Sequence, residues 1–159
     1  MKSNLIFFRD NGSYETGDIM GIKFTRLMDQ LSKDEGFKTQ PYKDPAGKLT
    51  IGVGRNLEDN GLSEREVRIL LMNDIDRVIT ELDTNYPFFV TLNDVRQEVL
   101  VNMCFNLGLP KFMGFKKMLE AVKIKDFKTA AEEMKNSKWF EQVGERAVRM
   151  CKQMESGVY

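Results

Sequence analysis

Residues 31–57 read LSKDEGFKTQPYKDPAGKLTIGVGRNL, and this stretch carries most of the information in the sequence. Glu35 comes first, Asp44 follows nine residues later, and Thr50 follows six residues after that. Four glycines and two prolines interrupt the run, which excludes one continuous helix. We predict a helix that ends near Glu35, an extended piece, a turn at residues 45–47 and a returning strand.

The helix before the turn is predicted to be amphipathic. Apolar residues recur at helical spacing on the face that also carries Glu35: Ile22, Phe24, Leu27, Met28 and Leu31. We therefore expect Glu35 to point along a buried face, next to apolar surface. A carboxyl in such a place holds its proton longer, because desolvation disfavours the charged form, and this suits a general acid.

The turn determines which side chains share a face of the hairpin. With residues 45–47 at the turn, Asp44 lies opposite Lys48 and Tyr42 lies opposite Thr50. Because residues two apart along a strand share a face, we expect Asp44 and Thr50 on the same side of the ribbon. A turn shifted by one residue would separate them.

Two carboxyls in contrasting surroundings, together with a hydroxyl, are the groups that glycoside hydrolysis uses. Glu35 would protonate the leaving oxygen, Asp44 would serve the opposite face of the sugar as an anion, and Thr50 would hold a water. The alternative is structural: Glu35 is a last-turn helix residue, Asp44 forms a turn before proline, and Thr50 favours a strand. Spacing alone does not decide between the two interpretations.

Composition bounds the class of protein. The chain has 159 residues, 42% of them hydrophobic and 30% charged, which is ordinary for a globular protein. The formal net charge is zero and no basic stripe is present, so we expect no nucleic-acid partner. No apolar run approaches the roughly 20 residues of a membrane helix, so we expect no stable membrane insertion.

The chain contains no histidine and only two cysteines. The lack of histidine removes histidine-based triads and most zinc or iron sites, so we expect no metal and no cofactor. Cys104 and Cys151 each fall in a predicted helix among apolar residues. Two cysteines do not make a disulfide framework, and we expect buried free thiols.

A long helix is predicted after a loop at residues 58–62. Ser63 as N-cap and Glu66 form a capping box, and the helical spacing of apolar residues continues to about Thr84, short of Pro87. Further helices are predicted over the ranges 91–108, 114–123 and 126–136, the last with Asp126 as its N-cap. The first of these has the wide apolar face of a helix at the centre of a helical lobe.

The motif residues resemble the phage T4-type lysozymes, the muramidase family of phage endolysins. The resemblance rests on Glu35-Gly36, Tyr42-Lys43-Asp44, Gly47 and Thr50-Ile51-Gly52-Val53-Gly54, because that family's Glu, Asp and Thr fall at this spacing. It continues over roughly residues 22–157. It implies an α+β, mainly α, lysozyme-like fold, in which a long helix joins a small N-terminal lobe with a β-hairpin to a helical C-terminal lobe.

The resemblance also implies the division of the chain, which is one lysozyme domain overall. Its expected parts are an extension at 1–20, the lobe with the hairpin and catalytic residues at 21–62, the connecting helix at 63–85 and the helical lobe at 86–159. Within the extension the sequence favours a short strand at 4–8 and a turn at 11–13.

The implied activity is hydrolysis of the β-1,4 bond between N-acetylmuramic acid and N-acetylglucosamine in peptidoglycan. Glu35 is then the general acid, and Asp44 and Thr50 handle the water. The family is associated with inversion, which requires about 6.5–9.5 Å between the two carboxyls. The alternative is a catalytically silent module on the same fold that binds glycan or a partner protein.

Further residues receive roles from the same resemblance. Arg146 matches the position whose guanidinium orients the catalytic glutamate, and Asn56, Phe105 and Asn106 match sugar-binding positions. The alternatives are core packing for Phe105 and a surface charge near a helix start for Arg146.

Two departures from the family pattern stand out. Arg55 occupies a position where relatives often have histidine paired with an acid, and the matching acid here is Asp74, so we expect a structural Arg55–Asp74 ion pair. The family is commonly basic, whereas this chain is neutral. The expected partner is the peptidoglycan glycan strand, bound by a monomer. Without a recognisable signal peptide, the chain would be made in a bacterial host cytoplasm and reach the cell wall or periplasm through holin-dependent release.

Overall fold

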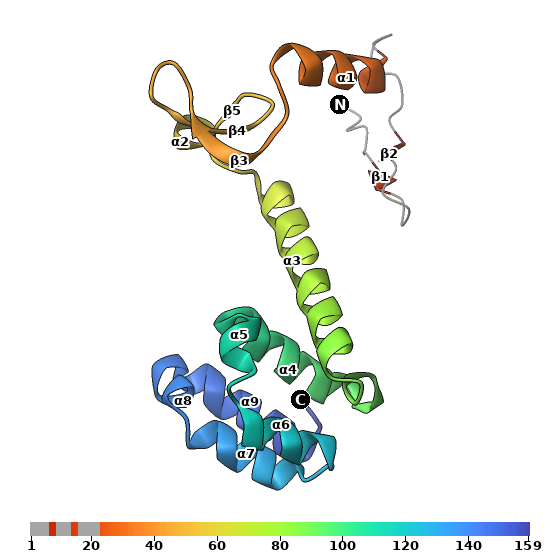
Figure 1. The fold of residues 1–159 in the computed structure, drawn as a ribbon, viewed down its shortest axis with the longest axis vertical. Coiled ribbons are helices and arrows are strands. Elements are labelled where there is room, and N and C mark those ends of the chain that lie inside the picture. The colour runs from red at the N-terminus through yellow and green to blue at the C-terminus, as the bar shows by residue number, and fades with distance from the viewer. Residues whose placement is uncertain (1–6, 9–13, 16–22) are drawn as a thin grey trace. The chain divides into compact units, whose positions relative to one another are not determined.

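The computed structural model describes residues 7–8, 14–15 and 23–159. The chain divides into two compact units, Met1–Glu64 and Arg65–Tyr159. Figure 1 labels the elements of both. None of the helices in the described part of the chain is long and apolar enough to cross a membrane.

The described part of the N-terminal segment is a short antiparallel pair. Strand β1 (Phe7–Phe8) lies beside β2 (Tyr14–Glu15). Strand β1 covers the end of the strand predicted at 4–8. The predicted turn at 11–13 and Ile22 of the predicted apolar face lie outside the described residues.

Helix α1 (Phe24–Asp34) ends where the sequence predicts. Glu35 is its C-cap residue, and the Glu35 N–H donates to the carbonyl of Leu31 at 2.9 Å. Gly36 follows at φ +83°, a left-handed conformation that glycine adopts without a steric penalty. A substitution at Gly36 would therefore strain the connection between the helix and the hairpin.

The first unit contains a three-stranded antiparallel sheet in the order β3 (Lys38–Lys43), β4 (Leu49–Gly52) and β5 (Arg55–Asn56). Tyr42 pairs with Thr50, which confirms the predicted hairpin register. Pro41 lies where the register of β3 shifts, between the paired residues Lys38 and Tyr42, which is a place where strands tolerate proline.

Residues 58–62 were expected to form a loop, and this expectation is wrong for residues 58–60, whereas residues 61 and 62 belong to no helix or strand. Helix α2 (Leu57–Asn60) makes a single turn there. The Asn56 side chain caps it by accepting a hydrogen bond from the Asp59 N–H at 3.0 Å. The backbone then leaves the turn at Gly61, which has φ +56°.

The second unit is helical. Its elements are the long α3 (Glu64–Asn85), which begins one residue before the unit does, the 3₁₀ turn η1 (Phe89–Thr91), α4 (Asp94–Leu107), α5 (Leu109–Phe112), α6 (Lys116–Lys123), α7 (Phe127–Lys135), α8 (Lys138–Val143) and α9 (Glu145–Ser156). Asp126 caps α7, as predicted, by accepting from the Thr129 N–H at 3.1 Å. The described chain is thus mainly α with a small antiparallel sheet, which agrees with the predicted fold class.

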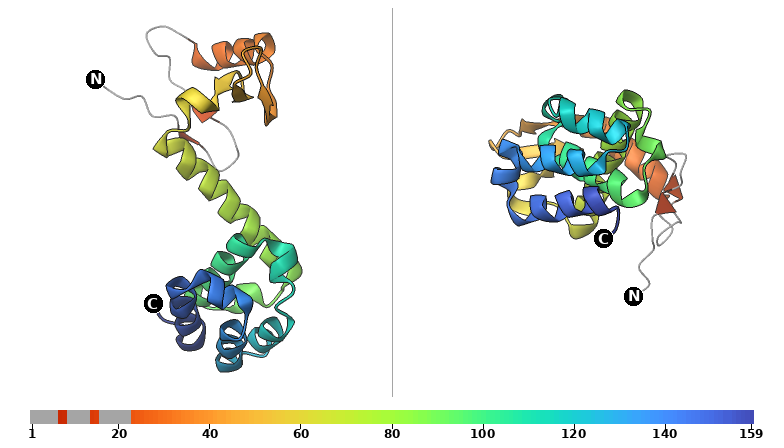
Figure 2. Two further views of the ribbon diagram at one scale, coloured as in Figure 1. Left: turned by 90° about the vertical axis from the view of Figure 1, so that its left-hand side faces the viewer. Right: turned by 90° about the horizontal axis from the view of Figure 1, so that it is seen from below.

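The core of the second unit surrounds α4. This helix has the wide apolar face that was predicted for it, with these buried side chains: Val95, Val99, Leu100, Met103 and Cys104. Helix α9 packs against α4 and α7 with a buried face of its own: Ala147, Met150, Cys151 and Met154. Figure 2 shows these blue and green helices gathered in one group. Each fully buried aliphatic side chain of this size contributes roughly 2 kcal/mol to the free energy of folding, so this core stabilises the unit.

Candidate functional site

The Asp44 carboxylate is held by the backbone of its own turn. Its Oδ1 accepts hydrogen bonds from the N–H of Ala46 at 2.9 Å and the N–H of Lys48 at 2.8 Å. The Asp44 N–H in turn donates to the Lys48 carbonyl at 3.0 Å. Aspartate before proline favours such a turn, because its short side chain bonds the backbone two residues on. Within the described residues, Oδ2 makes no hydrogen bond.

Thr50, the second residue of β4, is held by Lys48 as well. The Thr50 hydroxyl donates to the Lys48 carbonyl at 3.1 Å, and the side chain is only 3% exposed. The backbone of Lys48 therefore binds both side chains: its N–H donates to the Asp44 carboxylate, and its carbonyl accepts from the Thr50 hydroxyl. The predicted placement of Asp44 and Thr50 on one side of the hairpin follows from the confirmed register.

Glu35 lies at the C-terminal end of α1 and is exposed to solvent. Among the described residues Glu35 lacks the expected apolar surroundings, because the stripe of α1 is itself exposed to solvent: Leu27, Met28 and Leu31 are 39%, 42% and 44% exposed. The helical period correctly indicates that Glu35 continues this stripe. The expectation that the stripe is buried is wrong for the described structure.

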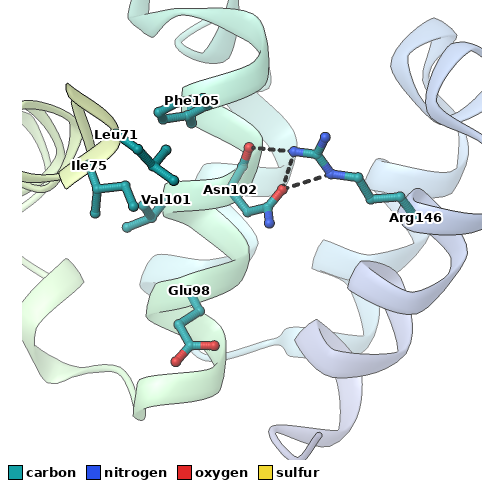
Figure 3. Close-up of a pocket in the computed structure, with 7 residues that line it drawn as sticks. All are labelled: Leu71, Ile75, Glu98, Val101, Asn102, Phe105 and Arg146. Carbon is teal, nitrogen blue, oxygen red and sulfur yellow. Dashed lines mark hydrogen bonds between the residues drawn. The ribbon is translucent and has the colours of Figure 1, made fainter. Parts of the chain in front are cut away.

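A pocket of about 400 Å³ opens on the second unit (Figure 3). Its lining consists of Leu71 and Ile75 from α3, Glu98, Val101, Asn102 and Phe105 from α4, and Arg146 from α9. Phe105 is 41% exposed, which excludes the alternative that it packs in the core. Its ring is thus accessible to a ligand at the pocket wall.

Arg146 is anchored at the pocket by Asn102. Its Nε donates to Asn102 Oδ1 at 2.9 Å, and a terminal nitrogen donates both to that oxygen and to the Asn102 backbone carbonyl, as Figure 3 shows. Because one helical residue receives three hydrogen bonds, the guanidinium is held against α4. Sequence reasoning assigned no role to Asn102, since an amide on a helix surface carries no distinctive pattern.

The two predicted sugar-binding asparagines make internal hydrogen bonds. Asn106 Oδ1 accepts from the indole N–H of Trp139 at 3.0 Å. Asn56 caps α2, and its Nδ2 donates to Asp59 Oδ2 at 2.8 Å. Each side chain therefore positions a local element, and its contact with sugar stays a prediction.

The predicted ion pair between Arg55 and Asp74 would join residues of different units, and it stays a prediction. Arg55 donates to the Gly61 carbonyl at 2.9 Å within the first unit. Asp74 accepts from Arg77 at 3.5 Å within the second, and both side chains of that pair are more than half exposed. The pairing of Glu35 with Arg146 is likewise a prediction. Among residues 7–8, 14–15 and 23–159, no three Cys, Asp or Glu side chains gather as metal ligands.

Comparisons with known proteins identify the family of the chain. The chain is 28% identical over 160 residues to probable T4-type lysozyme 1 of Dictyostelium discoideum, covering 82% of this chain and 94% of that protein. Probable T4-type lysozyme 2 of the same organism gives the same identity and coverage. The pre-baseplate central spike protein Gp5 of Enterobacteria phage T4 is 25% identical over 152 residues, which cover 78% of this chain and 26% of that protein. The family model of phage lysozyme matches residues 32–153, well over half of the sequence, and the chain therefore belongs to the phage lysozyme family.

Proposed function

We propose that this protein is a muramidase, which hydrolyses the β-1,4 bond between N-acetylmuramic acid and N-acetylglucosamine in peptidoglycan. Family membership supports a lysozyme-type glycoside hydrolase with peptidoglycan as substrate. The observation that carries the residue assignment is the shared anchor of Asp44 and Thr50 on Lys48. A module that only binds glycan has no need of a preorganised carboxylate and hydroxyl at this spacing.

In the proposed reaction, water adds across the glycosidic bond. Glu35 gives its proton to the leaving oxygen, Asp44 takes a proton from the attacking water, and the water oxygen bonds to the anomeric carbon. The Thr50 hydroxyl already donates to Lys48, so it would orient the water as an acceptor. No metal and no cofactor takes part.

The remaining roles belong to the same proposal. Arg146 orients Glu35, while Asn56, Phe105 and Asn106 contact the glycan. The Arg55–Asp74 pair is structural. The chain acts as a monomer on the cell wall or periplasm of a bacterium, after release from the cytoplasm through a holin. In this scheme the parts of the lysozyme domain are the lobe at 21–62, the connecting helix at 63–85 and the lobe at 86–159, preceded by the extension at 1–20.

Digestion of purified sacculi tests the proposal. The new reducing ends are reduced with borohydride and identified by mass spectrometry. A muramidase exposes N-acetylmuramic acid at these ends, whereas cleavage of the alternate bond exposes N-acetylglucosamine. The matched control is Glu35→Gln, which keeps the size of the side chain and removes its acid. If the wild type binds sacculi without forming new ends, the protein is a binding module and the proposal is wrong.

A further inference from the structure

Glu58 joins three elements of the first unit through one carboxylate oxygen. Its Oε1 accepts a hydrogen bond from the Leu49 N–H at 2.8 Å and from Lys43 Nζ at 2.9 Å. Lys43 is the last residue of β3 and Leu49 is the first of β4, and the two are paired across the strands. Glu58 itself belongs to α2. The carboxylate therefore ties α2 to both strands where the Asp44 turn begins and ends.

The N–H groups that bind the carboxylates of Asp44 and Glu58 belong to neighbouring residues. The Lys48 N–H donates to Asp44, and the following N–H, that of Leu49, donates to Glu58. Successive N–H groups of a strand point to opposite sides. The start of β4 is thus held on the β3 side by Asp44 and on the α2 side by Glu58.

Helix α2, which carries Glu58, is held in place by hydrogen bonds of its own. Asn56 caps the turn, and Asp59 accepts from Lys48 Nζ at 3.0 Å. The pKa of Glu58 is lowered, first by the hydrogen bond from Lys43 and then by that from the Leu49 N–H. Both hydrogen bonds thus favour the ionised carboxylate, and charge-assisted bonds of this kind are stronger than neutral ones.

Glu58 and Asp59 also form ion pairs with Lys43 and Lys48, the two lysines that flank the turn. Lys43 Nζ lies 2.9 Å from Glu58, and Lys48 Nζ lies 3.0 Å from Asp59 and 3.8 Å from Glu58. Among the described residues, neither lysine forms an ion pair with Asp44. The Asp44 carboxylate, the catalytic base proposed above, accepts two backbone hydrogen bonds at Oδ1, and within the described residues Oδ2 accepts none.

We propose that Glu58 is a positioning residue for the hydrolysis: it holds the start of β4 in register so that the Lys48 N–H presents the Asp44 carboxylate to the water. This inference rests on the proposed function, in which Asp44 activates that water. Glu58 acts through the backbone of residues 48–49 and does not touch the substrate.

Three variants of Glu58 test the inference on sacculi. Glu58→Ala removes both hydrogen bonds and is expected to lower kcat about tenfold, since small displacements of a catalytic group have effects of this order or larger, while KM stays unchanged. Glu58→Gln keeps an acceptor oxygen at the same reach and is expected to stay within about twofold of the wild type. Glu58→Asp keeps the charge on a shorter side chain and is expected to behave like Glu58→Ala, which preserves the test if the alanine variant does not fold. Glu120→Ala is the matched control, because Glu120 is also an exposed acid beside a lysine, Lys123 at 3.5 Å.

A double variant separates positioning from general stability. In the Asp44→Asn background, which removes the proposed base, Glu58→Ala is expected to cost no further activity. A merely structural role would lower the residual activity of Asp44→Asn as well. Circular dichroism confirms that each variant is folded at the assay temperature, so that kcat is read from folded protein.

The outcomes distinguish this inference from the proposed function. If Asp44→Asn is inactive while folded Glu58→Ala and Glu58→Asp both keep the wild-type kcat, the positioning role is wrong and the proposed function stands. Equal loss in Glu58→Gln and Glu58→Ala with a raised KM also overturns the inference, because the charge of Glu58 would then serve the substrate directly. If Asp44→Asn itself keeps full activity, the proposed function is wrong, and the inference, which depends on it, is wrong as well.

Discussion

Asp44 and Lys48 bond each other reciprocally across the hairpin turn: the Lys48 N–H donates to the Asp44 carboxylate at 2.8 Å, and the Asp44 N–H donates to the Lys48 carbonyl at 3.0 Å. The first hydrogen bond needs an acceptor oxygen on residue 44 but no charge. The proposed reaction needs the charge. The two requirements can therefore be separated by substitution at one position.

Asp44→Asn is expected to keep the fold and lose the activity. The amide oxygen replaces Oδ1 as acceptor for the N–H groups of Ala46 and Lys48, so the free energy of unfolding should change by less than about 0.5 kcal/mol. Asp44→Ala loses the acceptor as well and should cost about 1–2 kcal/mol. Urea denaturation and sacculus digestion measure the two effects. An active Asp44→Asn variant would remove Asp44 from the mechanism.

Thr50→Val tests the hydroxyl in the same way. Valine fills the space of this buried side chain, and the Lys48 carbonyl keeps its hydrogen bond from Asp44, so the expected loss of stability is about 1 kcal/mol. Activity should fall by more than the lower stability can account for, because the hydroxyl oxygen that orients the water has been removed. Thr91→Val is the control, since its hydroxyl also donates to a carbonyl, that of Phe88 at 2.7 Å, away from the proposed chemistry. Wild-type activity in Thr50→Val would contradict the assigned role.

The hairpin and helices α3, α4, α6 and α7 of the second unit were predictable because each leaves a local pattern. The turn residues fix the pairing of Tyr42 with Thr50, and the period of residues 95–104 fixes the buried face of α4. Helix α5 escaped prediction because Pro110 normally ends helices, yet here proline lies in the first turn, where its missing N–H costs nothing. A pattern therefore reveals an element only when the element is long enough to repeat it.

The contacts that fix the candidate site carry no such pattern. Glu58 accepts a hydrogen bond from a backbone N–H nine residues earlier, and every residue type except proline would offer that N–H at position 49. A helix of one turn shows no period, so α2 reads as a loop. For Glu35 the period identifies the face of α1, but whether another surface covers that face depends on tertiary packing, which no local pattern encodes.

The two cysteines are expected to be unreactive in the folded protein. Cys104 and Cys151 are fully buried, and burial raises the pKa of each thiol to about 11. Ellman's reagent at pH 8 should therefore release almost no chromophore from native protein and two equivalents in guanidinium chloride. Cys151→Ala should release one equivalent when denatured. Rapid reaction of native protein would show that a thiol is accessible.

The same shifts predict a loss of stability at high pH. In the folded protein the thiols keep their protons to about pH 11, whereas in the unfolded chain they titrate near the ordinary value of 9.0. Their contribution is fully present below about pH 9 and is lost as the pH rises towards 11, by roughly 1 kcal/mol per pH unit for each thiol. Urea titrations at pH 8 and 10 measure the fall. The Cys104→Ala/Cys151→Ala variant should be less stable throughout but show a smaller fall, and an equal fall in both proteins would assign the effect to other groups.

Gly157 and Arg96 are expected to be coupled in stability. Gly157 ends α9 at φ +74°, and a Cβ at this position would lie 2.5 Å from a terminal nitrogen of Arg96. That guanidinium cannot move freely, because it donates to the carbonyls of Met154 at 2.9 Å and Glu155 at 3.1 Å and stacks over the Phe127 ring. Gly157→Ala should therefore cost both the left-handed conformation, about 1–2 kcal/mol, and part of the Arg96 contacts, about 1–2 kcal/mol more.

A double-mutant cycle separates the two costs. In the Arg96→Ala background the clash is absent, so Gly157→Ala should cost only the conformational part, and the coupling free energy should be about 1–2 kcal/mol. Urea denaturation of the four proteins gives this value. Additive costs would mean that Arg96 moves aside and re-forms equivalent hydrogen bonds. In that case the tight fit between the end of α9 and the start of α4 contributes little to the stability of the second unit.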